Sequence, residues 1–166
     1  MLNRLPVTVF VMLLLVLSAC RDPPDYPNEP VIEYIGSNKT AMTQGPSIGD
    51  FVFLTISFTD GDGDLGSSDF GDSTRVYYAD TRLADPIVQS VSIPMVPELG
   101  SGNGISGEIR FKVPNSCCFY PPGFPIDCGP LEGFPTDTIV YDIFILDRKE
   151  NKSNVVQSEP IILLCN

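Results

Sequence analysis

Five aspartates stand close together in the segment FTDGDGDLGSSDFGDS, residues 58–73, which contains no Lys, Arg or His to balance them. Asp60, Asp62 and Asp64 alternate with glycines, which allow the backbone to curl so that three carboxylates face one centre. Hard oxygen donors at this spacing suit Ca²⁺, so the segment is a candidate Ca²⁺ site, with Asp147 of a later loop as a further ligand. The alternative is a solvated acidic turn between two strands.

The aspartate segment departs from the EF-hand loop in two places. Leu65 stands where the turn glycine belongs, and Gly71 stands where the bidentate glutamate belongs. A Ca²⁺ site here would therefore be a looser DxDxD loop.

Cysteine is the second residue type that could do chemistry. Four of the five cysteines lie in the carboxyl-terminal third of the chain, namely Cys117, Cys118, Cys128 and Cys165. An even number in an exported chain predicts disulfides. A bridge between adjacent cysteines would strain the peptide between them, so one neighbour should pair with Cys128 and the other with Cys165, in either arrangement. Zinc is the alternative use of four cysteines, but the chain has no CxxC spacing.

Most catalytic chemistry is excluded by composition. The chain has no histidine, which removes Ser-His-Asp and Cys-His catalysis and histidine-ligated metals. Oxidised cysteines are not nucleophiles. A carboxylate pair, as in glycosidases, is the remaining catalytic arrangement, and no acid stands in a recognisable apolar cleft. We therefore expect a protein that is not an enzyme.

The amino terminus, MLNRLPVTVFVMLLLVLSAC, has the layout of a secretory signal: one positive charge, a short apolar run and small residues before Cys20. Its last four residues, LSAC, resemble a bacterial lipobox, which implies cleavage before Cys20 and acylation of that cysteine. The resemblance predicts a lipid anchor, with the outer membrane as the expected location, facing either the periplasm or the medium. We divide the chain into a signal peptide (1–19), the lipidated Cys20 with a proline-rich linker (20–30) and one domain (31–166).

The net charge limits which classes of molecule the chain can bind. The whole chain has a formal net charge of −11, and an acidic surface repels nucleic acid. With 43% hydrophobic and 19% charged residues, the chain can still bury a core. The membrane is therefore expected as a partner through the lipid anchor alone.

Alternation of apolar and polar residues predicts strands throughout the domain. In 51–59 the even positions are all apolar, and in 105–113 Gly107, Ile109, Phe111 and Val113 should face inward. Seven strands are expected, over 31–35, 51–59, 75–79, 87–95, 105–113, 139–146 and 155–165, with Pro160 marking an edge or bulge in the last. No segment has a clear helical period, so the expected fold is an all-β, seven-stranded antiparallel Ig-like or fibronectin-like β-sandwich.

In this sandwich the aspartates and the cysteines would lie at opposite ends. The aspartate segment and loop 148–154 should share one end, while the cysteine-containing loop 115–137 and the carboxyl terminus should share the other. A first strand antiparallel to the second begins at the aspartate end, so the linker, about 30 Å long, joins there. The cysteine-containing loop would then point away from the membrane.

The loop CCFYPPGFPIDC offers Phe119, Tyr120 and Phe124 as a candidate partner-binding surface for a protein or a glycan. Alternatively, these rings fold back to cover the end of the sandwich. We therefore expect a membrane-anchored lipoprotein whose Ig-like domain is a non-catalytic interaction module. The alternatives are a calcium-braced structural envelope domain without a dedicated ligand and a small carboxylate-dependent hydrolase.

Several segments together resemble a group of uncharacterised lipoproteins of Bacteroidota: the lipobox, FTDGDGDLG, GNGISGEI, the CC-containing loop, FPTDTIVYDIFILDRKENKSN and PIILLC. The stretch DRKEN also resembles the DRAGN-type turn of bacterial Ig-like modules, with Glu150 where glycine is usual. The resemblance implies an outer-membrane lipoprotein with an Ig-like domain. It brings no activity with it.

Overall fold

The computed structural model describes residues 25–46, 49–66, 74–96, 104–122 and 128–166, so the signal segment and Cys20 lie outside the described residues. The described residues form ten strands, and none of their segments is a helix that could cross a membrane. The strands are β1 (Val31–Ser37), β2 (Ala41–Thr43), β3 (Phe51–Asp60), β4 (Arg75–Asp80), β5 (Gln89–Ser92), β6 (Ile105–Pro114), β7 (Thr136–Ile139), β8 (Tyr141–Leu146), β9 (Val156–Gln157) and β10 (Ile161–Leu164). The all-β prediction is confirmed.

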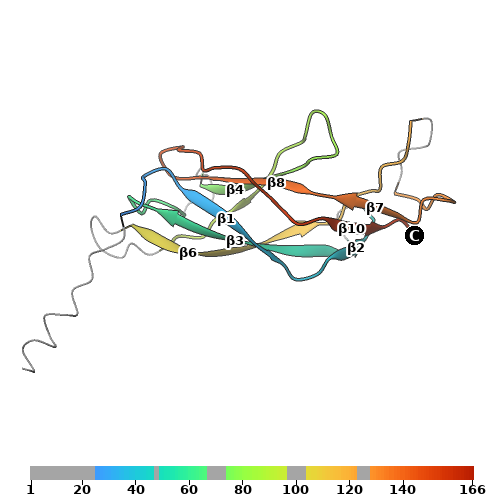
Figure 1. Ribbon diagram of the computed structural model, residues 1–166, viewed down its shortest axis with the longest axis horizontal. Coiled ribbons are helices and arrows are strands. Elements are labelled where there is room, and N and C mark those ends of the chain that lie inside the picture. Colours follow the sequence, from blue (N-terminus) through green and yellow to red (C-terminus); the bar gives the residue numbers. More distant parts are fainter. Residues whose placement is uncertain (1–24, 47–48, 67–73, 97–103, 123–127) are drawn as a thin grey trace, which may run out of the picture.

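The strands form three sheets, in the orders β1-β3-β6, β5-β4-β8-β9 and β2-β10-β7. All pairings are antiparallel except that of β2 with β10, which is parallel. In Figure 1 the sheet that contains β4 and β8 lies above the sheet that contains β1, β3 and β6. The short strands β2, β7 and β10 gather towards the end where the chain terminates (Figure 1).

Strand β3 illustrates why alternation produces this core. Val52, Leu54 and Ile56 have no exposed surface, and Phe58 is only 5% exposed. Successive side chains of a strand point to opposite faces, so these even positions all face the second layer, as predicted. The two layers meet in one apolar cluster, where the rings of Tyr78 on β4 and Phe111 on β6 lie 5.9 Å apart.

Strand β6 follows its predicted alternation only in part. Phe111 and Val113 are buried, whereas Ile109 is half-buried and Gly107 is exposed. Gly107 pairs with Phe58, and a Cβ at Gly107 would lie 3.2 Å from the Phe58 ring. The Phe58 ring thus fills the space that a side chain at Gly107 would need.

The expected seven-strand division differs from the ten strands observed. Segment 155–165 divides at Pro160 into β9, which pairs with β8, and β10, which pairs with β7 and β2. Segment 139–146 belongs to two strands because the chain passes from the β10 sheet to the β4 sheet at Val140. These passages between sheets depend on partners far away in the chain, so alternation along one segment did not predict them.

Two further differences concern short strands. Strand β2 lies between the first two predicted strands and was not predicted. The predicted strand over 87–95 is reduced to β5, which pairs with β4 and leaves Ile87 and Val88 outside, 73% and 50% exposed. Ile87 and Val88 therefore lie at the surface, whereas Ile93 of the same segment is buried in the core.

Strand register places the aspartate segment and the cysteine-containing loop at opposite ends of the domain, as predicted. Val31 pairs with Thr59, near the end of β3, and Gly61 donates a backbone hydrogen bond of 2.8 Å to Pro27. The chain therefore enters the domain beside the aspartate segment. At the opposite end of β3, Phe51 pairs with Pro114, which precedes the cysteine-containing loop.

Candidate functional site

The aspartate site is built at the point where β3 ends. Asp60 is the last residue of the strand, and the following backbone turns at Gly63, whose φ is +70°. Leu65 has no exposed surface and anchors the loop in the core. This burial gives a structural role to the residue that departs from the EF-hand pattern. Arg148 of the loop after β8 donates its backbone N–H to the carbonyl of Asp64 at 3.3 Å.

The structure brings Asp60, Asp62 and Asp64 together. One carboxylate oxygen of each lies within 4.8 Å of the others. Asp60 has no exposed surface and Asp64 is 8% exposed. Among the described residues, no donor reaches either oxygen of Asp60, the Oδ1 of Asp62 or the Oδ1 of Asp64. Four buried carboxylate oxygens of this cluster thus lack hydrogen-bond donors among the described residues.

The balancing charge that the segment itself lacks comes from Lys149, in the loop after β8. Its ammonium group contacts Oδ2 of Asp62 and lies 3.5 Å from Oδ2 of Asp64. The Lys149 side chain is 62% exposed. Lys149 therefore covers the outer oxygens of two aspartates, while the inner oxygens and all of Asp60 lie behind it.

The pKa values of the aspartates differ because Lys149 contacts Asp62 and Asp64 but not Asp60. Burial, together with the negative charges of Asp62 and Asp64, raises the pKa of Asp60 to about 7. Burial also acts to raise the pKa of Asp62, but the hydrogen bond and charge of Lys149, together with hydrogen bonding to Asp60 and Asp64, outweigh it, so the pKa of Asp62 is lowered. The deepest carboxyl is the one that the protein compensates least.

Asp147, the fourth predicted metal residue, is fully buried but is used by its own loop. Its carboxylate accepts backbone hydrogen bonds from Lys149 at 2.9 Å and Asn151 at 2.8 Å, and one from the Asn151 amide at 2.7 Å. Glu150, where DRAGN-type turns have glycine, adopts the left-handed φ of +65° that glycine favours. Asp147 therefore shapes the turn that holds Lys149, and its charge adds to the negative field that raises the pKa of Asp60 and Asp64.

The cysteines form two bridges at the opposite end, Cys117–Cys128 and Cys118–Cys165. The prediction that each adjacent cysteine takes a different distant partner is confirmed, and the structure decides between the two arrangements. Cys118 and Cys165 are buried, with the backbone N–H of Cys118 donating to the side chain of Gln44 at 3.1 Å.

The aromatic residues of the predicted binding surface lie in different environments. Phe119 is 36% exposed, and the guanidinium of Arg82 lies 4.2 Å from its ring centre. Tyr120 instead packs against the core, where its hydroxyl donates to the carbonyl of Gly129 at 2.7 Å and its ring meets Phe134. Phe124 lies outside the described residues. Of the two described rings, Phe119 is the more exposed.

Arg82, which the sequence did not single out, holds this end together. Its guanidinium forms ion pairs with Asp80 at 2.6 Å and with Asp137, and its side chain is only 12% exposed. Asp137 also accepts the backbone N–H of Phe119 at 2.8 Å. Arg82 follows strand β4 in an ordinary polar turn, TRLADP, so no periodic signal could have identified it.

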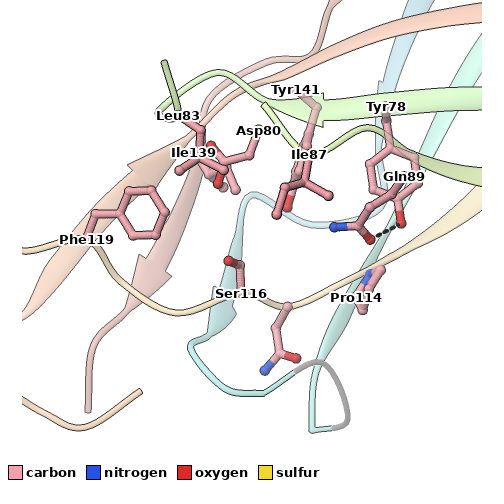
Figure 2. Close-up of a pocket in the computed structure, with 11 residues that line it drawn as sticks. Tyr78, Asp80, Leu83, Ile87, Gln89, Pro114, Ser116, Phe119, Ile139 and Tyr141 are labelled. Atoms are coloured by element: carbon pink, nitrogen blue, oxygen red, sulfur yellow. Dashed lines mark hydrogen bonds between the residues drawn. The ribbon is translucent and has the colours of Figure 1, made fainter. Parts of the chain in front are cut away.

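A recess of about 160 Å³ opens beside Phe119. Figure 2 shows Phe119, Leu83 and Ile87 among the residues that line it, together with Tyr141 and the hydrogen-bonded pair Tyr78 and Gln89. The full lining is Tyr78, Asp80, Leu83, Ile87, Gln89, Pro114, Asn115, Ser116, Phe119, Ile139 and Tyr141. These residues come from both sheet layers and from the disulfide-braced segment, so only the folded chain assembles them.

Comparison with known proteins gives no match to a family model, a curated protein or a solved structure. The two sites are therefore interpreted from their own chemistry.

Proposed function

We propose that this chain is a lipid-anchored envelope protein whose β-sandwich domain binds another protein through the recess beside Phe119. The observation that carries the proposal is the separation of the two ends of the domain. The chain enters beside Thr59 and Gly61, whereas the recess lies beyond Pro114, at the other end of β3. Ten residues of strand span about 30 Å, so an amino-terminal anchor would leave the recess facing away from the membrane.

Three features support the envelope location. The lipobox-like LSAC predicts acylation of Cys20 in the outer membrane. Two disulfides favour an oxidising compartment over the cytoplasm. A three-stranded sheet facing a four-stranded sheet supports the Ig-like interpretation, a fold common in cell-surface domains.

The chemistry around the recess favours a polypeptide partner. Ile87 is 73% exposed beside Phe119 at its mouth, and exposed apolar residues around a concavity are typical of protein-binding sites. A cavity of about 150 Å³ holds one benzene ring, so this recess fits a single large side chain of a partner. Tyr78, Gln89 and Asn115 supply polar groups that could orient it. The proposed role is non-catalytic recognition.

Anchoring is tested by replacing Cys20 with Ser. We expect the variant to lose fatty-acid labelling and to leave the membrane fraction, because the thiol is the site of acylation. Unchanged membrane association of Cys20→Ser would contradict the anchor, whatever the domain binds.

Partner binding is tested by crosslinking on intact cells followed by identification of the captured protein. Phe119→Ala and Ile87→Ser should each reduce capture of that protein at least about tenfold, since the central anchor residues of an interface typically contribute about 2 kcal/mol or more. Ile35→Ser is the matched control, because Ile35 is 54% exposed on β1 outside the recess. Equal loss in the control, or binding of a glycan array in place of a protein, would contradict the proposal.

A further inference from the structure

Asp60 is a buried acid that the protein leaves uncompensated. It has no exposed surface, and no donor among the described residues reaches either of its oxygens. An ionised carboxylate in such a position is strongly destabilised unless it is neutralised or paired. Lys149 does not supply the pairing, because among the described residues its ammonium group pairs with Asp62 and Asp64 and not with Asp60.

We propose that Asp60, Asp62 and Asp64 bind one Ca²⁺ ion at the end of β3. Oxygens that share a Ca²⁺ ion at 2.3–2.6 Å can lie no more than about 5 Å apart. The three carboxylates already meet this limit, with ligand oxygens within 4.8 Å of one another. Their spacing is therefore compatible with one shared ion.

The free oxygens identify where the ion would bind. Both oxygens of Asp60 and the Oδ1 atoms of Asp62 and Asp64 lack partners, whereas Lys149 contacts the Oδ2 atoms of Asp62 and Asp64. The ion thus binds behind the Lys149 ammonium group. Two positive charges from the ion and one from Lys149 balance the three carboxylates.

The loop is held in the form that the ion requires. Asp60 belongs to a strand paired on both sides, Leu65 is buried in the core, and the Asp64 carbonyl accepts a hydrogen bond from Arg148. Only the short turn at Gly63 separates these fixed points. Less of the binding free energy is then lost in ordering the loop.

The donor set favours Ca²⁺ over other common ions. All candidate ligands are carboxylate oxygens, and the chain contains no histidine, which disfavours Zn²⁺ and Cu²⁺. Mg²⁺ prefers one or two carboxylates and keeps several of its waters. Ca²⁺ accepts six to eight oxygens, so backbone carbonyls or water would complete its coordination shell beside the four free carboxylate oxygens.

The test measures thermal unfolding of the full-length chain after removal of metal with EDTA. At Ca²⁺ concentrations about 100 times the Kd, mass action should raise the Tm by about 5–10 °C. Isothermal titration should give one ion per chain. An equal concentration of Mg²⁺ should produce a clearly smaller shift.

Two variants separate a specific site from general charge screening. Asp60→Asn keeps the shape of the side chain and should abolish the Ca²⁺-dependent shift, and the more exposed Asp62→Asn should reduce Ca²⁺ affinity at least about tenfold. Asp85→Asn removes the same charge from an exposed position and should keep the full shift. A wild-type Tm and titration indifferent to Ca²⁺, an equal response to Mg²⁺, or a shift that survives in Asp60→Asn and Asp62→Asn would each overturn the proposal. The site lies at the opposite end from the recess, so this result is independent of partner binding.

Discussion

At the scale of single residues, the two ends of the domain compensate buried charge in different ways. Arg82 is surrounded by Asp80 and Asp137, both of which reach its guanidinium. Asp60 instead lies beside the carboxylates of Asp62 and Asp64, and no donor in the described part of the chain reaches it. The first arrangement is complete within the protein, whereas the second is complete only with a cation or a proton.

The pH dependence of stability should reveal Asp60 in the metal-free protein. Its folded-state pKa of about 7 lies above the ordinary value of 3.8, so the folded state binds more protons than the unfolded state between these values. The free energy of unfolding in EDTA should therefore fall as the pH rises from about 5 to about 7. The raised pKa of Asp64 acts in the same direction, whereas the lowered pKa of Asp62 acts at lower pH.

Urea denaturation at a series of pH values measures this dependence. Asp60→Asn should flatten most of the slope, because the asparagine side chain does not titrate. Wild-type stability that rises between pH 5 and 7 in EDTA would show that Asp60 is ionised without cost.

Replacing Arg82 with Met should be strongly destabilising. The substitution keeps most of the volume but leaves Asp80 and Asp137 facing each other without a cation. Breaking a buried ion pair in this way costs about 3 kcal/mol of unfolding free energy. Arg110→Met is the control, since Arg110 is exposed and stacks on Phe53, a contact that contributes about 1 kcal/mol or less. Equal effects in chemical denaturation would contradict the role of the Arg82 network.

At the scale of elements, residues 25–30, which precede β1, pack against the start of the aspartate loop. Gly61 donates a hydrogen bond to Pro27, and a Cβ at Gly61 would lie 2.2 Å from the carbonyl oxygen of Tyr26. A Cβ at Gly104, just before β6, would lie 2.7 Å from the Tyr26 ring. The two glycines allow the incoming chain to lie directly on the end of the sheet.

Gly61→Ala should therefore release this segment. The added methyl group collides with backbone rather than with a flexible side chain, so we expect a loss of about 1–3 kcal/mol and faster proteolysis within residues 25–30. Gly49→Ala serves as the comparison, because a Cβ there would be 3.8 Å from Asn115 and should change stability by about 0.5 kcal/mol or less. If residues 25–30 resist proteolysis equally well in the wild type and in Gly61→Ala, the close contact between this segment and Gly61 would be contradicted.

At the scale of the whole molecule, the two disulfides close loops of very different size. The Cys118–Cys165 bridge spans 47 residues and ties the carboxyl terminus to the segment after β6, whereas Cys117–Cys128 spans 11. A crosslink restricts the unfolded chain more when its loop is longer. The longer bridge should therefore contribute more to stability.

Paired serine substitutions test this difference. Loss of the longer bridge should cost about 4 kcal/mol and loss of the shorter about 3 kcal/mol in the chain-entropy description. The difference should widen because Cys118 and Cys165 are also buried in the core. A larger loss from the Cys117 and Cys128 pair in chemical denaturation would contradict this order.

The sequence by itself determined the features that depend on local pattern. Alternation predicted the all-β class and the buried positions of β3, because the side-chain period of a strand is set by its backbone. The antiparallel order of the first two strands predicted which end receives the linker. The strain of a bridge between adjacent cysteines predicted that Cys117 and Cys118 take different partners. The DGDGD spacing was enough to bring three carboxylates together.

Only the tertiary structure decided the features that join distant segments. Lys149 reaches Asp62 across 87 residues, and Arg82 reaches Asp137 across 55. The division of two predicted strands between sheets and the assembly of the recess from both layers depend on the same long-range packing. Spacing along a chain carries no record of which distant residues meet in space, because those contacts form only when the sheets pack and exclude water from the groups between them.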